Sequence, residues 1–572
     1  MLNNSLFYYF MLDHGLEVYK GESTRQIICL SFEYGSRSYE TEHKRLKKLL
    51  KSADNEDLKV RLEAAIKRVE ANKDKYSPMS RDKIREYFYE HGVDVTYKKR
   101  NKDGSIKSEE LIHYRMLTRS SGKAKLGMCL FIDDKLYDIA HNWLTMGIKL
   151  PDKGAKIVEM SAYMPLTTST IIGKIHIDVD DFLVLKDQDS FFRTMADIVR
   201  ANEYGEPDEN GNRKMMCVVD YEETDVKNTL WDGMGLVESS ILPSYINGMV
   251  LLRNHFFKMC GFRTHIQKFF RYWCNKTGID YDTYQIEDMF GNKKYLKNIK
   301  VITTNNALKI FKFMDLMGDN PYEYWCDKVR ADGCMWGVVK TDHVSKLGEY
   351  QQLSYQMVNS LPTTRDEIRE IASESIKYVE LLKSDPVEFE KFLRKNANEV
   401  NHYEMMADLY DHNHEFADSK WFRGEKRKII SSYVHKLRTG KIFVNGDNLT
   451  VCGNPYALLL YSVGEDFLKD PTLQFEKGTI QCFTPRFQDG EYLIGFRSPQ
   501  NNPGNIAYLH NRYSPEMFEY FEFSGNVLAV NCINTDIQPR LNGMDHDCPK
   551  GRIGSVATQF KNYSVKIGKL SV

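Results

Sequence analysis

The order of its blocks is the feature that most constrains this chain: two β-rich blocks flank a helical one, and another helical block precedes them. Residues 39–73, 77–92 and 364–410 repeat apolar residues at helical spacing with charges between them. Short β-prone runs bounded by Gly, Pro, Asp and Asn fill the rest. This pattern predicts an α+β multidomain fold.

The shifts in pattern predict five regions. At 572 residues the chain is too long for one core, so several domains are expected. Residues 155–163 are among the runs that predict strands. The regions are a helical N-terminal region at 1–125, a β-rich lead-in at 126–214, a first β block at 215–318, a helical bridge at 319–436 and a second β block at 437–572.

Charge and cysteine content restrict the function classes. Lys+Arg and Asp+Glu both number 79, which argues against a protein that coats nucleic acid over its whole surface but allows a local basic channel. Eleven cysteines without a Cys-x-x-Cys pair indicate reduced thiols in a cytosol. No apolar run approaches the ~20 residues that span a bilayer, and no signal peptide is expected. We therefore expect a cytoplasmic protein without a membrane partner.

The stretch "RLNGMDHDCPKGR", residues 540–552, carries the clearest chemical signal. In an extended segment the side chains of Asp545 and Asp547 point to the same side, so both carboxylates can meet one cation. Two carboxylates supply a minimal grip for Mg²⁺, which otherwise keeps waters and substrate phosphates. Asp-x-Asp is also frequent in turns, so the spacing alone favours an ordinary turn over a metal site.

Other candidate residues are basic. Arg497 comes at a predicted strand end and has the donor geometry to bind a ribose or a phosphate. Lys258, Lys309 and Lys312 lie among apolar residues, where a lysine either reaches the surface along its stem or is aimed at an anion. Taken alone, each lysine favours the first interpretation.

Together these pieces resemble the two-barrel RNA polymerases. That superfamily includes the β and β′ subunits of cellular RNA polymerases, the eukaryotic RNA-dependent RNA polymerases of gene silencing, and single-chain polymerases of phages and mobile elements. Each segment is weak alone, and the order and approximate spacing carry the resemblance over residues 125–548. The segments are "WDGMGLVESS" at 231–240, "LLRNHFFKMCGF" at 251–262, "TTNNALKIFKF" at 303–313, "GFRSPQNNPGN" at 495–505 and "NGMDHD" at 542–547.

The resemblance implies two double-psi β-barrels joined by a helical bridge. It implies Lys258 and Lys309 as catalytic lysines of the first barrel, with Lys312 the alternative to Lys309. It also implies Arg497 as the reader of the nucleotide sugar, and Asp545 and Asp547 as catalytic metal ligands. Asp232, in the segment that opens the first barrel, is implied to bind substrate.

The implied activity is template-directed RNA synthesis by two-metal phosphoryl transfer, with Mg²⁺ or Mn²⁺ as cofactor. Its partners would be a nucleic-acid template, here expected to be DNA, the RNA product and nucleoside triphosphates. The setting would be the cytoplasm of a bacterial or phage-infected cell. The sequence does not predict an oligomeric state.

The match breaks after Asp547. The family's loop carries a third aspartate where this chain has Pro549, which offers no ligand and fixes the backbone. We therefore expect impaired activity and a second barrel that is incomplete at its C-terminus, as if a longer parent had been truncated or shifted in frame. "SVATQF" and "YSVKIGKLSV" are β-prone candidates for a substitute strand. The alternatives are an inactive polymerase-derived module that binds nucleic acid, and another Mg²⁺-dependent phosphodiesterase.

Overall fold

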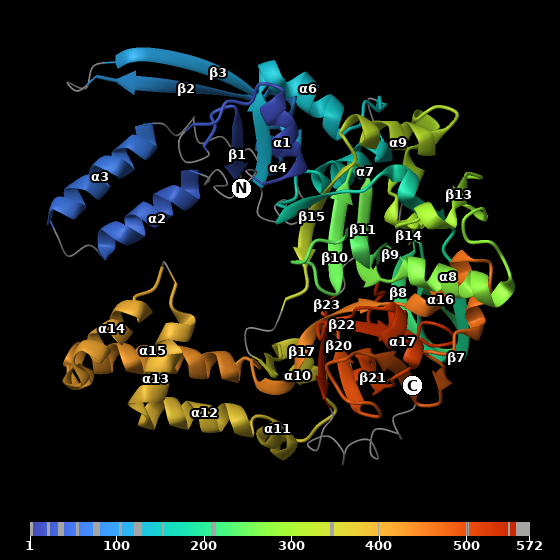
Figure 1. Cartoon of the computed structure of the whole chain (residues 1–572). Coiled ribbons are helices and arrows are strands. Elements are labelled where there is room, and N and C mark those ends of the chain that lie inside the picture. The colour runs from blue at the N-terminus through green and yellow to red at the C-terminus, as the bar shows by residue number, and fades with distance from the viewer. Residues whose placement is uncertain are drawn as a thin grey trace. The chain divides into compact units, whose positions relative to one another are not determined.

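In the computed structural model the chain forms two units, described here one at a time (Figure 1). Unit 1 comprises residues 1–179, 252–258 and 308–339, and unit 2 comprises 180–251, 259–307 and 340–572. The structure describes residues 4–19, 23–31, 39–52, 56–71, 81–101, 106–118, 128–151, 154–207, 213–343, 348–398, 400–498, 500, 503–546 and 550–555. None of the described helices is long and apolar enough to cross a membrane.

Unit 1 contains both helices and a sheet. Its helices are α1 Leu6–Asp13, α2 Tyr39–Lys51, α3 Glu56–Ala71, α4 Arg81–His91, α6 Asp134–Leu144, α7 Ala155–Tyr163 and α9 Pro321–Ala331. Its strands are β1 Ile27–Ser31, β2 Val93–Arg100, β3 Ile106–Thr118, β4 Met128–Asp133, β5 Gly173–His176 and the first part of β15 Met335–Thr341. Helices α2, α3 and α4 lie where the helical spacing predicts them.

The prediction of a helical region over residues 1–125 was incomplete. An antiparallel sheet in the order β1-β4-β3-β2 lies there as well, and β2 pairs with β3 from Val93↔Tyr114 onward. The alternating pattern of these strands is obscured by charged residues over 98–110, because much of the ribbon's length is exposed. Tyr114 and Phe131 are fully buried, so the apolar face of the sheet is confined to its inner end.

The predicted strand at residues 155–163 was wrong: this segment is helix α7. Met160 is buried, whereas Ile157 is 38% exposed and Val158 66% exposed. A β-branched pair favours a strand only when a pleated surface packs against it, and here no such packing occurs. Similarly, β4 ends at Asp133, whose side chain caps the N-terminus of α6 by accepting from the Lys135 amide.

Unit 2 contains two sheets, a long ribbon and a helical bundle. Its strands before residue 310 are β6 Phe182–Leu185, β7 Asp189–Tyr204, β8 Lys214–Thr229, β9 Met234–Glu238, β12 Gln285–Glu287, β13 Lys293–Tyr295 and β14 Val301–Thr304, with helix α8 Ile266–Thr277. Strands β10 Met249–Asn254 and β11 Phe257–Thr264 run from one unit into the other.

The remaining elements of unit 2 continue the helical and β order. The helices are α10 Tyr355–Ser360, α11 Arg365–Ile371, α12 Ser373–Ser384, α13 Pro386–Asn396, α14 Tyr403–His412, α15 Lys420–Arg438, α16 Pro455–Ser462, α17 Pro515–Tyr520 and α18 Ile537–Arg540. The strands are β16 Tyr350–Gln352, β17 Phe443–Cys452, β18 Phe475–Glu476, β19 Thr479–Phe483, β20 Tyr492–Phe496, β21 Ile506–Asn511, β22 Val527–Val530 and β23 Lys550–Ser555.

The second sheet closes on itself. Its order is β17-β22-β19-β21-β20-β23, and β23 pairs back with β17. Full closure removes the exposed edges of a sheet. The closing strand follows directly after the Asp-x-Asp loop, whereas the β-prone tail segments proposed for this role extend over residues 556–572, which lie outside the described residues.

Both sheets contain the same pairing sequence. In the first, β11 runs parallel to β9, β9 antiparallel to β14, and β14 parallel to β6. In the second, β17 runs parallel to β22, β22 antiparallel to β19, and β19 parallel to β21. Two four-stranded runs with parallel, antiparallel and parallel pairing therefore occur in one unit, although the letters show no internal repeat.

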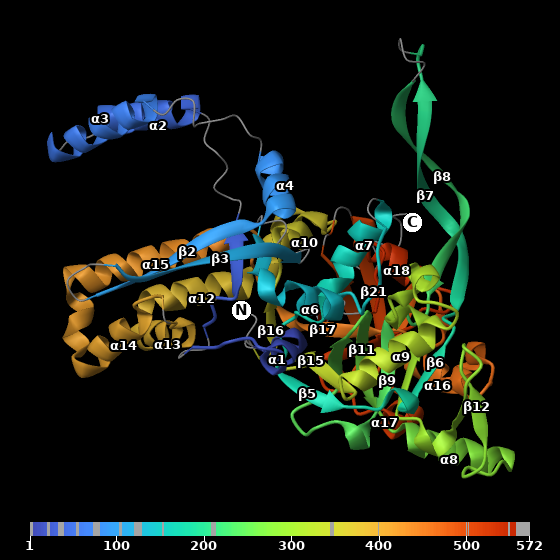
Figure 2. The same ribbon diagram turned by 90° about the horizontal axis from the view of Figure 1, so that it is seen from above.

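Strands β7 and β8 form a two-stranded ribbon that twists away from the rest of unit 2 (Figure 2). At its base the ribbon is held by polar contacts: the Asn534 amide donates to the Ser190 hydroxyl at 2.9 Å, and Asn228 Nδ2 donates to the carbonyl of Thr535. Residues 215–223, the start of the predicted first β block, lie in β8, so they belong to this ribbon and not to a sheet interior.

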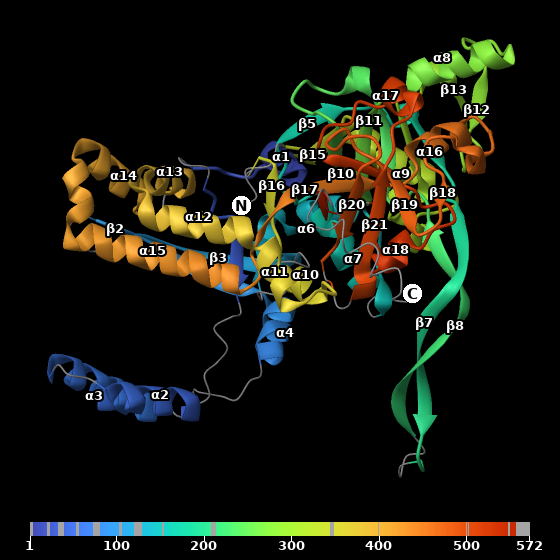
Figure 3. The same cartoon turned by 90° about the horizontal axis from the view of Figure 1, so that it is seen from below.

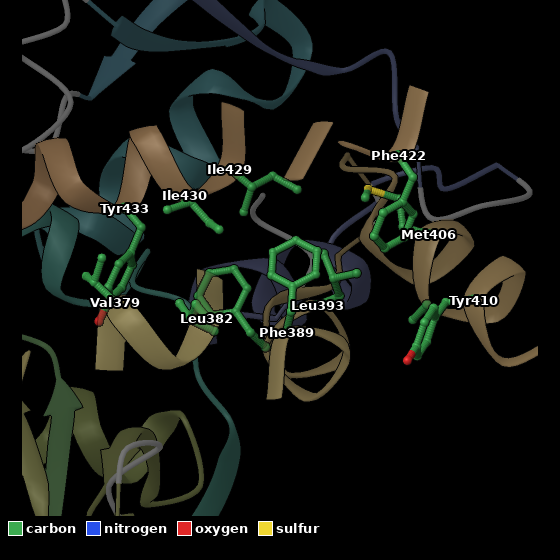
Figure 4. Close-up of a cluster of buried hydrophobic side chains, with 12 residues drawn as sticks. Val379, Leu382, Phe389, Leu393, Met406, Tyr410, Phe422, Ile429, Ile430 and Tyr433 are labelled. Carbon is green, nitrogen blue, oxygen red and sulfur yellow. The ribbon is translucent and has the colours of Figure 1, made fainter. Parts of the chain in front are cut away.

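Helices α11 to α15 make the bridge between the two sheets into a separate bundle (Figure 3). The bridge predicted at 319–436 also contains β15 and β16, which separate helix α9 from the helices that start at Tyr355. The bundle core is apolar and largely aromatic (Figure 4). Its buried members are Val379, Leu382, Phe389, Phe392, Leu393, Met406, Ala407, Tyr410, Phe422, Ile429, Ile430 and Tyr433.

The segment before β9 and the segment after β17 approach each other closely at Gly453. A Cβ placed on Gly453 would lie 2.0 Å from the carbonyl oxygen of Leu230 and 3.3 Å from His546 Nε2. Neighbouring Trp231 is fully buried, and its indole Nε1 donates to the carbonyl of Asn454 at 2.9 Å. Only glycine allows this approach of two backbones.

We expect Gly453→Ala to destabilise unit 2 by about 2–3 kcal/mol, because the methyl group overlaps backbone that is fixed on both sides. Urea unfolding followed by tryptophan fluorescence measures the change. Gly424→Ala is the matched control, since a Cβ at Gly424 in α15 meets nothing within 4 Å. There we expect a gain of about 0.5–1 kcal/mol. Equal stability of the native chain and Gly453→Ala would contradict the assigned contact.

Candidate functional site

The Asp-x-Asp loop begins with a tight turn. Asn542 and Gly543 have φ of 56° and 64°, two successive left-handed residues of the kind that Asn-Gly sequences favour. Met544 returns the chain to the core, where its amide donates to the carbonyl of Gln538 at 3.0 Å. Asp545 follows as a half-buried residue, while Asp547, Cys548 and Pro549 lie outside the described residues.

His546 is directed into the core. It is fully buried, and its Nε2 lies 3.2 Å from Gln538 Nε2 and 3.6 Å from Cys532 Sγ. This nitrogen is therefore occupied by protein contacts, as expected for a structural histidine. Because successive side chains of an extended segment alternate, burial of His546 fits an Asp545 that faces the other side.

Asp232 contacts the same loop through its backbone. The amide of His546 donates to the carbonyl of Asp232 at 2.8 Å, although more than three hundred residues separate them in sequence. Gly233 at φ 77° turns the chain directly after Asp232 and into β9. The structure thus brings together Asp232 and the Asp545–His546 peptide, and both aspartates are half-buried.

Arg497 contacts the start of the loop. Its Nη1 donates to the carbonyl of Leu541 at 3.0 Å and to that of Asn542 at 3.1 Å. Asn505 holds the same turn from β21, because its Nδ2 donates to Asn542 Oδ1 at 3.1 Å. Three predicted site residues from separate segments, Asp232, Arg497 and Asp545, therefore meet at one loop of unit 2.

A set of buried polar contacts, called here the polar seam, holds these segments in place. Its members are Asn228, Thr229, Trp231, Asn454 and Gln538. Thr229 and Gln538 exchange two hydrogen bonds, with the Thr229 amide donating to Oε1 at 2.7 Å and Nε2 donating to the Thr229 carbonyl at 2.6 Å. Asn454 Nδ2 donates to Asp470 Oδ2 and Asn531 Oδ1. Burial makes such bonds costly to break, so the seam fixes the register between the two regions.

Asp187 is a functional candidate that the sequence reasoning missed. Its Oδ1 accepts from the Trp231 amide at 3.2 Å, and its Oδ2 accepts from Thr304 Oγ1 at 2.9 Å and Asn306 Nδ2 at 3.0 Å. Burial raises the pKa of Asp187 to about 6, although these hydrogen bonds act in the opposite direction. Asp187 thereby ties the segment before Asp232 to the end of β14. Its only sequence signal was a position just after the apolar run 182–185.

The predicted lysines lie in unit 1. Phe257 and Leu308 form an antiparallel bridge, and the amide of Lys309 donates to the carbonyl of Phe256 at 2.7 Å. Each lysine directly follows a residue of this bridge, so their backbones lie in neighbouring segments of unit 1. Both are half-buried.

Lys312 has a different environment. It is exposed, and its Nζ lies 3.2 Å from Glu159 Oε1 on helix α7 and 5.8 Å from the centre of the Tyr163 ring. The hydrogen bond to Glu159 raises the pKa of Lys312. The structure therefore groups Lys309 with Lys258 and gives Lys312 an ion pair of its own.

The carboxylates do not by themselves complete a metal centre. Among the described residues, no group of three or more His, Cys, Asp or Glu side chains is placed to hold a metal ion. Asp545 offers a hard oxygen of the kind that Mg²⁺ prefers, but one carboxylate among the described residues does not define a magnesium site.

Comparisons with known proteins give matches among solved structures. No protein-family model and no curated protein matches the chain. Among solved structures, the RNA-dependent RNA polymerase QDE-1 from Thielavia terrestris is similar, with a TM-score of 0.47 and 11% identity. The match covers 79% of this chain and 45% of that one, so this chain spans less than half the length of that polymerase. We rest no argument on this likeness.

We expect the stability difference between the native chain and Asp187→Asn to depend on pH. Because the fold raises the pKa of Asp187 from 3.8 to about 6, its contribution is greatest below pH 4 and is lost as the pH rises through 6. The advantage of the native chain over the variant should shrink by up to about 3 kcal/mol over that range. Urea unfolding at pH 4, 5, 6 and 7 measures it, with exposed Asp366→Asn as the control; parallel profiles would exclude the raised pKa.

Proposed function

We propose that this chain is a template-directed RNA polymerase of the two-barrel type, acting on a DNA template with nucleoside triphosphates as substrates. The single observation that carries the proposal is the meeting of Asp232, Arg497 and the Asp545 loop, because three motifs chosen from separate segments meet at one loop. The matching strand pairing of the two sheets supports it, since a paired-barrel enzyme is built from two copies of one topology.

Each residue has a role that follows from its placement. Arg497 is held at one end by the loop carbonyls, which fixes its guanidinium plane, and we assign it to the ribose of the incoming nucleotide. Lys258 and Lys309 are half-buried, and we assign both to hold phosphates and to offset charge that develops on them. Lys309 is preferred to Lys312, because Lys312 is paired with Glu159.

Asp545 and Asp547 would hold Mg²⁺. The ion, when bound, supplies Lewis-acid chemistry for phosphoryl transfer. In this proposal Asp545 binds the ion on the face of the loop opposite His546. The hydrogen bond from the His546 amide to the Asp232 carbonyl fixes the position of the loop backbone. Base pairing with the template selects the nucleotide, so no side chain needs to read sequence.

Pro549 is the residue that sets the level of activity in this proposal. A proline in place of the third carboxylate removes one hard ligand from a site that otherwise has two. We infer that the chain as it stands is a weak polymerase. The alternative of an inactive module that binds nucleic acid rests on the same residue.

We expect Pro549→Asp to raise primer extension above that of the native chain in the presence of Mg²⁺ or Mn²⁺, because it restores the missing ligand. The assay is elongation of a labelled RNA primer on a DNA template, with an RNA template in parallel. Equal elongation by both chains would contradict the inferred impairment. Template binding without elongation by either chain supports the inactive module, and cleavage of the nucleic acid without extension supports the phosphodiesterase.

In the Pro549→Asp background we expect Asp545→Asn to abolish extension and Lys258→Gln to lower its rate at least about 100-fold, because each removes charge at the reacting phosphates. Single-turnover extension rates measure both changes. Asp366→Asn on α11 is the matched control for a lost carboxylate, since Asp366 is exposed and paired only with Arg369. Unchanged extension in Asp545→Asn would overturn the assigned site.

A further inference from the structure

Helix α15 carries half of the Lys and Arg residues of the helices α11 to α15, with a single acidic residue among them. Its sequence, KWFRGEKRKIISSYVHKLR, has seven Lys or Arg and one Glu. Helices α11 to α14 have the opposite balance, with ten Asp or Glu and seven Lys or Arg. The bundle is therefore electrically asymmetric, although the whole chain has a formal net charge of zero.

The cations of α15 occupy more than one face: Lys426 lies against the core, with its Nζ 4.9 Å from the centre of the Phe389 ring, and others lie on the opposite side. Phe422, Ile429, Ile430 and Tyr433 are buried in the bundle core. At 100° per residue, the positions on the side away from this core face are 420, 424, 427, 428, 431, 435 and 438. These positions, called here the outer stripe, hold Lys420, Gly424, Arg427, Lys428, Ser431, His435 and Arg438.

Three of the four Lys or Arg residues of the outer stripe lack ion pairs with described residues, and the fourth, Lys428, pairs with Glu425 at 2.7 Å. Lys420, Arg427 and Arg438 are exposed, and none of them lies within 4.0 Å of a carboxylate of a described residue. By contrast, Lys377, Lys383 and Lys391 on α12 and α13 each pair with a glutamate three positions away. Lysines of one bundle thus divide into a compensated set and an uncompensated one.

Gly424 is a second, independent observation. Glycine within a helix costs about 1 kcal/mol relative to alanine, and no neighbouring atom at Gly424 requires it. Its position in the outer stripe, between Lys420 and Arg427, leaves bare backbone where a large ligand would touch the helix. Ser431 then offers a hydroxyl donor between Arg427 and Arg438.

We propose that the outer stripe of α15 binds the phosphate backbone of a nucleic-acid duplex. From Lys420 to Arg438 the stripe is about 27 Å long, which corresponds to about eight base pairs. Phosphates are bound by Arg, Lys, Ser and backbone groups, and such contacts position a duplex without reading its sequence. The inference takes from the proposed function only that the chain handles nucleic acid, and it adds a binding surface outside the polymerase site.

A membrane surface is the less suitable partner. A helix that binds a bilayer inserts its apolar face into the lipid, but the apolar face of α15 is already occupied by the bundle core. The outer stripe itself contains no large apolar residue. An anionic membrane and an acidic protein therefore remain outcomes of the test, and the duplex is the proposal.

The experiment compares two triple variants of the full chain by fluorescence anisotropy with a labelled duplex of about 20 base pairs. Lys420→Gln, Arg427→Gln and Arg438→Gln remove the stripe; Lys377→Gln, Lys383→Gln and Lys391→Gln remove the same charge from α12 and α13. We expect only the first variant to lose affinity, with the slope of log K against log salt shallower by about three, one for each lost phosphate contact. Separate duplexes of DNA, of RNA and of RNA–DNA hybrid identify the preferred form.

Three results would overturn the proposal. The two triple variants could lose duplex affinity equally, or both could bind the duplex as tightly as the native chain. The stripe could also bind anionic vesicles or polyglutamate as tightly as it binds the duplex. Circular dichroism verifies that both variants keep the bundle. Failure of the proposed function is read separately, from primer extension. If the native chain never elongates a primer, and duplex affinity falls only in the variant that lacks the stripe cations, the polymerase proposal is contradicted. The proposed duplex-binding stripe is then still supported.

Discussion

The polar seam between the two sheets of unit 2 is the constraint on which the candidate site depends. Trp231 is buried at this contact with its indole bonded to the Asn454 carbonyl, and Thr229 and Gln538 exchange hydrogen bonds beside it. Each bond joins residues that are more than two hundred positions apart. Because unsatisfied buried polar groups are costly, the two regions can dock in one register only.

The site inherits its geometry from this register. Asp232 follows Trp231 directly, and the His546 amide bonds to its carbonyl, so the seam determines where the Asp545 loop lies. Asp187 extends the same network from Trp231 to the end of β14. Burial disfavours the charged form of the Asp187 carboxylate. The group is tolerated here because four hydrogen-bond donors surround it. Positioning of the site is thus achieved by neutral and charged hydrogen bonds, not by ion pairs.

The helical bridge combines two separate demands on one sequence. Most inward positions of α15 are apolar and are buried in the core that contains Phe389 and Leu393, and Lys426 lies over the Phe389 ring. The outward positions are under no packing demand, yet they carry cations without partners and a glycine in open space. Packing does not explain these residues, which lie on the side of α15 away from the core, and they therefore suggest a ligand.

The sequence by itself determined the block order and the helices at residues 39–51, 56–71 and 81–91, because these depend on local periodicity and local backbone preference. It also singled out Asp232, Arg497 and Asp545 as site residues. Only the tertiary structure decided that residues 155–163 are a helix, that β23 closes the second sheet, and that Asp187 belongs to the site. These features depend on contacts between segments that are distant in sequence, and the local sequence does not determine the energies of such contacts.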